Sequence, residues 1–582
     1  MLTRWHVAAP DFPTQHILTT SLALSPLLCQ LLINRGITDP AAARAFLSPS
    51  LHDLPDPFLL HGMQRAVQRL LTALQRDELI AIYGDYDVDG VTGTALLVTF
   101  FGELGRTVPY YIPERASEGY GLNAAAIEQL ARQGVRLLLT VDCGITAVHE
   151  IALARHLGMD VIITDHHQPS EVLPEAWALL NPHQPACTYP NKGLCGVGVM
   201  FKLLTALRAA LRQANLFTDR LPNLKRHLDL VTLGTIADVT PLQGENRVIV
   251  SYGLQELAQT RKRGLQALRE VSGRAGKSAT VGEVGFQLAP RLNASGRLGS
   301  AAESVALLLA ESDQEAAFLA QRLDAVNQER RALQQSIEEA VHDCITRQYG
   351  DHPPAALVLG DPEWHLGVVG IVAARIAERY HRPTFLLQIQ GETARGSGRS
   401  IPAFDLYQGL QHCAHWLRQF GGHKYAAGLT MDAAHLPHFQ ADFVRFAEQT
   451  LAPLDLCPTL HLDMFVTLAD ITPSLLEQLA NLAPHGAHNP TPLFGAQQVQ
   501  IVPPLRTLGQ QGQHVRCRMA QNGTLIDVIA FNMTEQVRSF ANAGLLDIAF
   551  TPALNTWQGR NTVELQLRAL RPHEPYALGE KH

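Results

Sequence analysis

The 582 residues are too many for a peptide or a disulfide-stapled scaffold, and a hydrophobic content of 46% against 17% charged residues excludes a disordered chain. At a soft prior of about 150 residues per domain, this length predicts roughly four domains with cores of their own. The net charge of −7 excludes a uniformly basic nucleic-acid-binding protein. Residues 201–300 nevertheless carry 15 Lys and Arg against 7 Asp and Glu, which fits either a phosphate-binding patch or a solvated helical surface.

Neither the cysteines nor the apolar runs indicate a secreted or membrane protein. The eight cysteines are scattered, without a CxxC pair or a zinc-like spacing, which is typical of reduced thiols. No stretch approaches the roughly 18 uninterrupted apolar residues of a membrane span. The start of the chain, MLTRWHVAAPDF, lacks the features of a signal peptide. We therefore expect a cytoplasmic protein with no membrane partner.

Residues 1–60 are predicted to form an N-terminal extension of short amphipathic pieces interrupted by proline. From 61 to 312, short apolar runs alternate with helix-compatible segments, which predicts a domain built on a parallel sheet of βαβ units. The expected strands are 79–83, 137–141 and 161–164, and the expected helices between and after them are 91–104, 123–133 and 146–157. Acidic residues follow each of these strands, and ligands bind at the carboxyl ends of such strands, so we expect them to converge on one site.

The remaining chain predicts three further parts. Residues 313–350 have helical spacing with almost no Gly or Pro, which suits a connecting helix. Residues 351–450 return to an α/β rhythm, and residues 451–575 alternate short strands with turn residues, as in a small OB-like β-barrel. The predicted fold class is therefore α/β: a parallel-sheet domain and a second α/β domain joined by a long helix, plus a C-terminal OB-like β-barrel.

The segment YGDYDVDGVTG places Asp85, Asp87 and Asp89 directly after a strand and before a helix. Clustered carboxylates of this kind are ligands for hard cations. The D-x-D-x-D-G pattern also opens an EF-hand loop, but its twelfth position would be Leu96 and a strand precedes it, so an EF-hand is excluded. A surface acidic turn without a ligand remains the alternative.

Two further motifs follow strands, and a third ends a helical run. These are TVDCGIT with Asp142, TDHHQP with His166 and His167, and GTIADVTPL with Asp238. Two adjacent histidines alone also fit a hydrogen-bonded turn, and Asp238 alone also fits an exposed cap. Together the four motifs supply enough ligands for two divalent ions, with Asp142 placed to bridge them, which favours phosphoester hydrolysis. The HExxH and GxSxG motifs of zinc peptidases and serine hydrolases are absent.

The ordered set GDYDVDG, TVDCGIT, TDHHQP and GTIADVTPL resembles the four motifs of the DHH phosphoesterase superfamily. Over about residues 60–450, RLNASGRLG, WHLGVVGIVAARIAERY, ARGSGRS and GGHKYAAG resemble the additional motifs of its RecJ family of single-strand-specific exonucleases. The resemblance implies a DHH catalytic domain at 61–312 and a DHH-associated domain at 351–450. It also implies hydrolysis of single-stranded DNA from the 5′ end to mononucleotides, with two Mg²⁺ or Mn²⁺ ions, in recombination and DNA repair. A single-strand-binding protein and a RecQ-type helicase are the implied partners.

The resemblance also implies roles for single residues of the acidic motifs. Asp85, Asp142 and His167 are implied as catalytic, His167 through the scissile phosphate or the transition state. The implied metal ligands are Asp89, Asp142, His166 and Asp238 for one ion and Asp87 with Asp142 for the other. Tyr83 departs from the family, many members of which have a histidine ligand there, so the ligand set of the second ion stays open.

Phosphate and DNA contacts are implied for Arg115, Arg297, Ser397, Arg399 and His423, the last within GGHKYAAG. The arginine fork suits a pair of phosphate oxygens, and we interpret the glycines of RGSGRS as a loop that lets the backbone approach the phosphate. For each arginine a surface ion pair remains the alternative. For the whole chain, the alternatives are a DHH phosphodiesterase of short oligonucleotides or cyclic dinucleotides, and a catalytically silent scaffold that binds single-stranded DNA.

Overall fold

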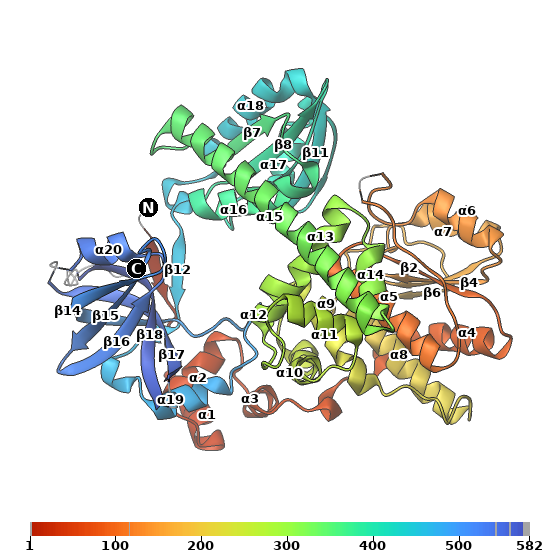
Figure 1. Ribbon diagram of the computed structural model, residues 1–582, viewed down its shortest axis with the longest axis horizontal. Helices are drawn as coiled ribbons and strands as arrows, with labels where there is room; N and C mark the ends of the chain where they lie inside the picture. Colours follow the sequence, from red (N-terminus) through yellow and green to blue (C-terminus); the bar gives the residue numbers. More distant parts are fainter. Residues whose placement is uncertain (1–2, 116, 542–543, 558–559, 574–582) are drawn as a thin grey trace. The chain divides into compact units, whose positions relative to one another are not determined.

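The computed structural model describes residues 3–115, 117–541, 544–557 and 560–573, and the chain divides into two compact units (Figure 1). The first unit contains Pro55–Thr240 and Tyr252–Pro458. The second contains Thr3–Leu54, Pro241–Ser251 and the residues from Thr459 onward. Both units are therefore assembled from segments that are distant in the sequence.

The first sheet of the first unit is entirely parallel, with the strand order β3-β2-β4-β5-β6. All residues of β2 and β4 are buried, as expected for a parallel sheet that helices cover on both faces. Helices α6 and α7 share a core with one face of the sheet, and α5 and α8 pack on the other. The strands are β2 (Ile80–Gly84), β3 (Tyr110–Tyr111), β4 (Leu137–Val141), β5 (Asp160–Thr164) and β6 (Ala178–Leu180).

Three helices of the first unit, α5, α6 and α7, lie close to the predicted segments 91–104, 123–133 and 146–157. The helices around the first sheet are α4 (Met63–Gln75), α5 (Val88–Glu103), α6 (Ala124–Arg132), α7 (Val148–His156), α8 (Gly196–Gln213) and α9 (Leu228–Ala237). A helical layer follows with α10 (Gly244–Ala258), α11 (Arg263–Val271), α12 (Val281–Glu283), the π-helical turn η4 (Val284–Leu288), α13 (Ala289–Leu298) and α14 (Ala302–Leu309). The start of α10 belongs to the second unit.

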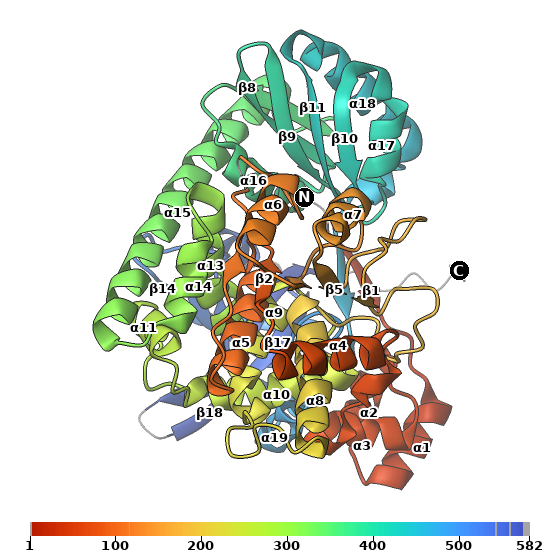
Figure 2. The same ribbon diagram turned by 90° about the vertical axis from the view of Figure 1, so that its right-hand side faces the viewer.

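The long helix α15 (Asp313–Tyr349) has the bounds that the sequence predicts (Figures 1 and 2). Its first half packs against α11, α13 and α14, and its second half packs against α16 (Leu366–Tyr380) through Ile337, Val341 and Ile345. One continuous helix thus connects the two α/β regions of this unit.

The second sheet of the first unit is mixed, with the order β10-β11-β9-β8-β7 and a single parallel pair, β7 with β8. Its strands are β7 (Leu357–Asp361), β8 (Thr384–Gln390), β9 (Thr393–Arg399), β10 (Leu417–Gly422) and β11 (Ala426–Asp432). Two helices complete this region, α17 (Leu406–His412) and α18 (Leu436–Thr450).

The interpretation of RGSGRS as a loop is wrong, because these residues form strand β9. A Cβ atom at Gly396 would lie 2.1 Å from the backbone oxygen of Leu386, and one at Gly398 would lie 2.4 Å from the ring of Phe385. The glycines are therefore needed for close packing against β8, not for a flexible turn.

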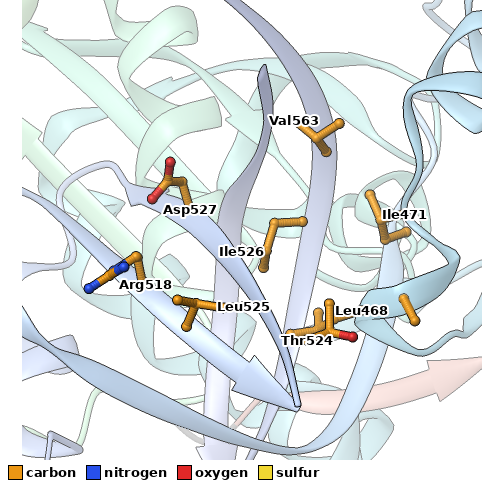
Figure 3. Close-up of a pocket in the computed structure, with 9 residues that line it drawn as sticks. Leu468, Ile471, Arg518, Thr524, Leu525, Ile526, Asp527 and Val563 are labelled. Carbon is orange, nitrogen blue, oxygen red and sulfur yellow. The ribbon is translucent and has the colours of Figure 1, made fainter. Parts of the chain in front are cut away.

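The second unit is a closed barrel with the strand order β13-β14-β15-β16-β18-β17, which pairing of β14 with β17 closes. Its strands are β13 (Met464–Phe465), β14 (Phe494–Leu508), β15 (His514–Gln521), β16 (Thr524–Ala530), β17 (Leu546–Trp557) and β18 (Arg560–Pro572), and its helices are α19 (Pro473–Ala480) and α20 (Thr534–Ser539). A pocket of about 450 Å³ opens beside β16 where it is not paired with β18, and Figure 3 shows Arg518, Leu525 and Asp527 among its lining residues.

The N-terminal residues pack into the core of the barrel unit. Strand β1 (Arg4–Val7) pairs in parallel with β12 (Thr459–Leu462), and three helices bury side chains in the barrel core. These helices are α1 (Phe12–Leu22), α2 (Pro26–Asn34) and α3 (Pro40–Leu47). Among the described residues, no single helix combines the length and apolar character of a membrane span, although the bent pair α1 and α2 together meet those two criteria.

Arg247 explains why residues 241–251 belong to the barrel unit. Its side chain is buried, lies 3.8 Å from the ring centre of Phe46 and donates to the backbone oxygens of Phe46, Asn481 and Ala483. These carbonyl acceptors satisfy a guanidinium that is otherwise costly to bury. The predicted fold class, two α/β regions joined by a long helix plus a β-barrel, is confirmed, and the predicted domain boundaries stay a prediction.

Candidate metal centre

The carboxyl ends of β2, β4 and β5 bring acidic residues from three motifs to one sheet edge. Gly84 is paired in register with Val141, and Val141 with Thr164, so the residues that follow each strand lie side by side. Asp85 and Asp142 follow the first two strands, and Asp165 follows the third. The structure thus brings together residues that are up to 80 positions apart in the chain.

The turn after β2 is held by its own carboxylates. Oδ1 of Asp87 caps helix α5 and accepts hydrogen bonds from the backbone N–H of Asp89 at 2.8 Å and of Gly90 at 3.2 Å. A Cβ at position 90 would lie 2.4 Å from the backbone oxygen of Asp85, so only glycine fits there. The D-x-D-x-D-G pattern therefore shapes a strand-to-helix turn that presents three carboxylates.

There are three groups of residues in each of which the possible ligand atoms all lie within 4.8 Å of one another. Asp142 belongs to two of the groups and His166 to two. The groups are Asp85, Asp87 and Asp142; Asp89, His166 and Asp238; and Asp142, His166 and His167. This arrangement fits two adjacent cation sites that share Asp142, as the four motifs predict, and the assignment of ligands remains a proposal.

Asp142 lies at the centre of the cluster, in a left-handed backbone conformation with φ of +62°. Its buried Oδ1 lies 3.0 Å from Nε2 of His166 and 3.8 Å from Nδ1 of His167, yet it accepts no hydrogen bond from the described residues. Oδ1 of Asp85 is likewise buried without a donor in that part of the chain. Buried carboxylate oxygens without donors are available to a cation.

Asp89 is fixed by the first turn of helix α8. Its Oδ2 accepts the backbone N–H of Gly196 at 2.5 Å, and its Oδ1 accepts that of Val197 at 2.8 Å. A Cβ at Gly196 would lie 2.6 Å from Cβ of Asp142, so glycine lets this helix approach both carboxylates. The amino end of a helix stabilises negative charge. Sequence reasoning missed Gly196 and Val197, and the only signal was their place at the start of an apolar helical run.

Burial and mutual repulsion make this cluster unfavourable in its fully ionised form. Burial, followed by the charge of Asp87, raises the pKa of Asp85 to about 8 and that of Asp89 to about 7. Burial and the charge of Asp89 raise the pKa of Asp238 to about 8, and the same two causes raise the pKa of Asp142 well above its usual range. A divalent cation would remove this penalty. The donor set of several carboxylates and one imidazole fits Mg²⁺ or Mn²⁺.

The two histidines are held in different protonation states. Burial and then the charge of His167 lower the pKa of His166 to about 4, which leaves the neutral imidazole that metals bind. Burial lowers the pKa of His167, but the hydrogen bond and charge of Asp165 outweigh burial and raise it to about 9. His167 is therefore a proton donor near neutral pH.

Asp165 orients His167, a role that the sequence reasoning did not assign. Its Oδ1 lies 2.7 Å from Nδ1 of His167 and accepts the backbone N–H of His166 and His167, while Oδ2 accepts that of Ile145. Burial raises the pKa of Asp165, but the hydrogen bond from His167 outweighs burial, so the net shift is downward. Asp165 is thus an ionised positioning residue.

Tyr120 contacts the acidic cluster through its hydroxyl group, whereas Tyr83 does not. Tyr120 was missed: its hydroxyl donates to the backbone oxygen of Asp142 at 3.1 Å and lies 3.1 Å from Nδ1 of His167. Tyr83, where the family often has a histidine, is buried, and its hydroxyl donates to the backbone oxygen of Gly121 and accepts from Asn123. Those bonds engage the Tyr83 hydroxyl outside the acidic cluster.

Three of the predicted phosphate-binding residues are arginines that influence one another. Burial and then the charges of Arg115, Arg330 and Arg399 lower the pKa of Arg297 to about 10, whereas Asp87 raises it. Nη1 of Arg297 donates to the backbone oxygen of Gly367 at 3.3 Å, and the guanidinium of Arg115 lies 5.3 Å from the ring centre of Tyr86. No ion pair between any of Arg115, Arg297 or Arg399 and a carboxylate occurs within the described ranges.

The remaining predicted contacts lie on the second sheet. Nη1 of Arg399 donates to Oγ of Ser397 at 2.9 Å, so strand β9 presents both groups on one face. His423 lies in the β10–β11 turn, where its backbone N–H donates to Ala426 and its side chain is exposed. The structure records no contact between the side chain of His423 and the acidic cluster within the residues it describes.

Three family models match separate parts of the chain. Residues 79–235 match the DHH family, N-terminal domain, residues 354–451 match the DHHA1 domain, and residues 462–569 match the RecJ OB domain. The single-stranded-DNA-specific exonuclease RecJ of Bacillus subtilis is 38% identical over 97% of this chain and 70% of its own. The protein of that name from Escherichia coli is 36% identical over 94% of this chain and 96% of its own.

Solved structures are similar as well. The crystal structure of RecJ in complex with Mn²⁺ from Thermus thermophilus superposes with a TM-score of 0.83 at 32% identity, covering 99% of this chain and 80% of that one. A structure of exonuclease RecJ bound to manganese has a TM-score of 0.59 at 37% identity and covers 70% of this chain and all of the other.

Proposed function

Because the chain belongs to the RecJ family of single-stranded-DNA-specific exonucleases, we propose that it hydrolyses single-stranded DNA from the 5′ end, with two Mg²⁺ or Mn²⁺ ions at the acidic edge of the first sheet. The observation that carries this proposal is the group of buried, mutually repelling carboxylates around Asp142, with oxygens that accept no hydrogen bond from the described residues. When bound there, two divalent ions would supply an activated water and would stabilise charge on the leaving oxygen.

We assign metal binding and stabilisation of the scissile phosphate to separate residues of the chain. Asp89, His166 and Asp238, whose possible ligand atoms lie within 4.8 Å of one another, would hold one ion together with Asp142, and Asp87 with Asp142 would hold the other, with Asp85 beside it. His167, oriented and charged through Asp165, donates a hydrogen bond to an oxygen of the scissile phosphate as negative charge develops there. Tyr120 supports His167 and the Asp142 backbone from the other side.

The direction of digestion requires a pocket that recognises a terminus. Arg115, Ser397 and Arg399 supply two guanidinium groups and a hydroxyl for a terminal 5′ phosphate, and Arg297, whose pKa the charges of Arg115 and Arg399 lower, is a further candidate contact. A phosphate bound there would place the next phosphodiester over the ions. The role of His423 stays a prediction, as do docking to a single-strand-binding protein and a RecQ-type helicase, and a cytoplasmic location.

The test compares a long 5′-phosphorylated single strand, a blunt duplex, a dinucleotide and a cyclic dinucleotide in the presence of Mn²⁺. We expect mononucleotides to be released from the long single strand and the blunt duplex to resist. Preferential cleavage of the dinucleotide or cyclic dinucleotide would instead support the phosphodiesterase alternative, and binding without cleavage would support the silent scaffold.

A further inference from the structure

A groove lies between η4, α13, α15 and α16, outside the acidic cluster and the proposed 5′-phosphate pocket. Its volume is about 580 Å³, and its lining contains three arginines, two glutamines, one glutamate and the exposed ring of Phe286. We refer to it as the α15 groove, because helix α15 supplies most of its polar residues. Figure 2 shows the course of that helix.

The charge of the groove is unbalanced. Its one acidic residue, Glu338, is already paired with Arg375 at 3.0 Å. Arg331 is exposed and makes no ion pair among the residues that the structure describes. The lining therefore carries net positive charge, which suits an anionic ligand.

The surroundings of Arg330 independently indicate an anionic ligand in the groove. It is only 8% exposed, its Nη atoms donate to the neutral side chains of Gln334 and Asn327, and its buried Nε has no acceptor within the described part of the chain. Burying a guanidinium without an anionic partner is costly, so its retention here indicates a ligand that completes it.

Phe286 gives the groove an aromatic surface. The ring is 78% exposed and projects from the π-helical turn Val284–Leu288, a rare geometry that occurs often at functional sites. Proteins bind single strands with exposed aromatic rings beside arginines that have no carboxylate partner. The bases stack on the ring, and the phosphates form ion pairs with the guanidinium groups.

We propose that the α15 groove binds the single strand on the 3′ side of the scissile bond, with a base stacked on Phe286 and a phosphate at Arg330 and Arg331. The proposal rests on the proposed function: when mononucleotides leave from the 5′ end, only one nucleotide lies on the 5′ side of the cut. Any further subsite along the strand must then contact its 3′ part. Helix α16 links the groove to the 5′-phosphate pocket, because it supplies Ile371 and Arg375 to the groove and a Cβ at its Gly370 would lie 3.4 Å from Nη2 of Arg399.

The test measures binding by fluorescence anisotropy in EDTA, so that hydrolysis does not interfere, with a 20-nucleotide single strand and a dinucleotide. For Phe286→Ala we expect the dissociation constant of the long strand to rise about tenfold, with an unchanged salt dependence. For Arg331→Gln we expect the slope of log K against log salt to become less steep by about 0.7, the value for one phosphate contact on a single strand. Dinucleotide binding changes less than twofold in both variants.

Phe318→Ala is the matched control, because Phe318 is also on the surface of the first unit, 62% exposed, but does not line the groove. Unchanged long-strand affinity in Phe286→Ala and Arg331→Gln would overturn the proposal, and so would an equal loss for the dinucleotide. Digestion of the long strand by the parent protein is measured separately, so a failure of the groove and a failure of the exonuclease function give different results.

Discussion

In the first sheet, Asp85, Asp142 and Asp165 follow the last residues of three adjacent strands, whereas in the second sheet Ser397 and Arg399 lie within strand β9, two residues apart. The three acids are buried, and backbone N–H groups of Ile145 and His166 hold Asp165. The arginine group gathers side chains from three separate segments of the chain. Each side is electrostatically unfavourable alone: carboxylates repel carboxylates, and guanidinium groups repel guanidinium groups. Divalent ions would relieve the repulsion among the carboxylates, and a phosphate strand would relieve the repulsion among the guanidinium groups.

The largest expected effect comes from the acidic side. Asp142→Asn should lower the rate of hydrolysis by at least about 1,000-fold, because the residue shared by both ion sites loses a charged ligand. Single-strand binding should persist through the arginines. The measurement is single-turnover digestion of a 5′-phosphorylated strand, with Asp160→Asn, at the opposite end of β5, as control. Normal turnover by Asp142→Asn would contradict the shared-ligand assignment.

A smaller loss is expected when only the orientation of His167 is disturbed. Asp165→Asn should lower the rate about 100-fold, since an outer partner of this kind is commonly worth 10–100-fold. The affinity for Mn²⁺ should change little, and the pH profile should shift because the pKa of His167 falls without the carboxylate. An unchanged pH profile would show that Asp165 is merely structural.

Among the arginines, Arg399→Ala should remove the preference for a 5′-phosphorylated strand and leave hydrolysis at the metal centre intact. The parent should digest a 5′-phosphorylated strand faster than a 5′-hydroxyl strand, because a charge-assisted hydrogen bond is worth about 1.5–3 kcal/mol. The variant should lose most of that preference, about tenfold or more, while Mn²⁺ affinity stays the same. If the variant prefers the 5′ phosphate as strongly as the parent, the pocket is wrongly placed.

The smallest expected effect is on stability without metal. The folded-state pKa values of Asp85 and Asp238, about 8, and of His167, about 9, lie above their ordinary values, so the folded state binds more protons than the unfolded state between pH 6.5 and 8. Stability should therefore fall as pH rises through this window. We expect the Tm in EDTA to decrease by a few degrees (~2–4 °C), and Mn²⁺ to flatten the dependence and raise the Tm. A Tm that rises with pH in EDTA would contradict this account of the cluster.

Local pattern was sufficient for several elements. The apolar runs before Asp85, Asp142 and Asp165 predicted β2, β4 and β5 to within one residue, and the absence of Gly and Pro predicted α15 over its full length. These elements depend on residue spacing and burial alone, and their acidic ends converge because parallel strands end at one edge. The four motifs therefore indicated a metal centre before any contact was known.

Tertiary contacts decided the rest. The glycines of RGSGRS suit a loop as well as a strand until β8 packs against them, and residues 3–54 show no sign of pairing with residues more than 400 positions away. Asp165 and Tyr120 take part in the site only because their side chains contact His167. The first turn of α8 takes part only because its backbone N–H groups donate to Asp89. By itself, the sequence determined which residues carry charge and which segments form strands and helices. Only the tertiary structure decided which charges meet, because a hydrogen bond or a buried ion pair depends on distances of a few ångströms between segments that local pattern leaves independent.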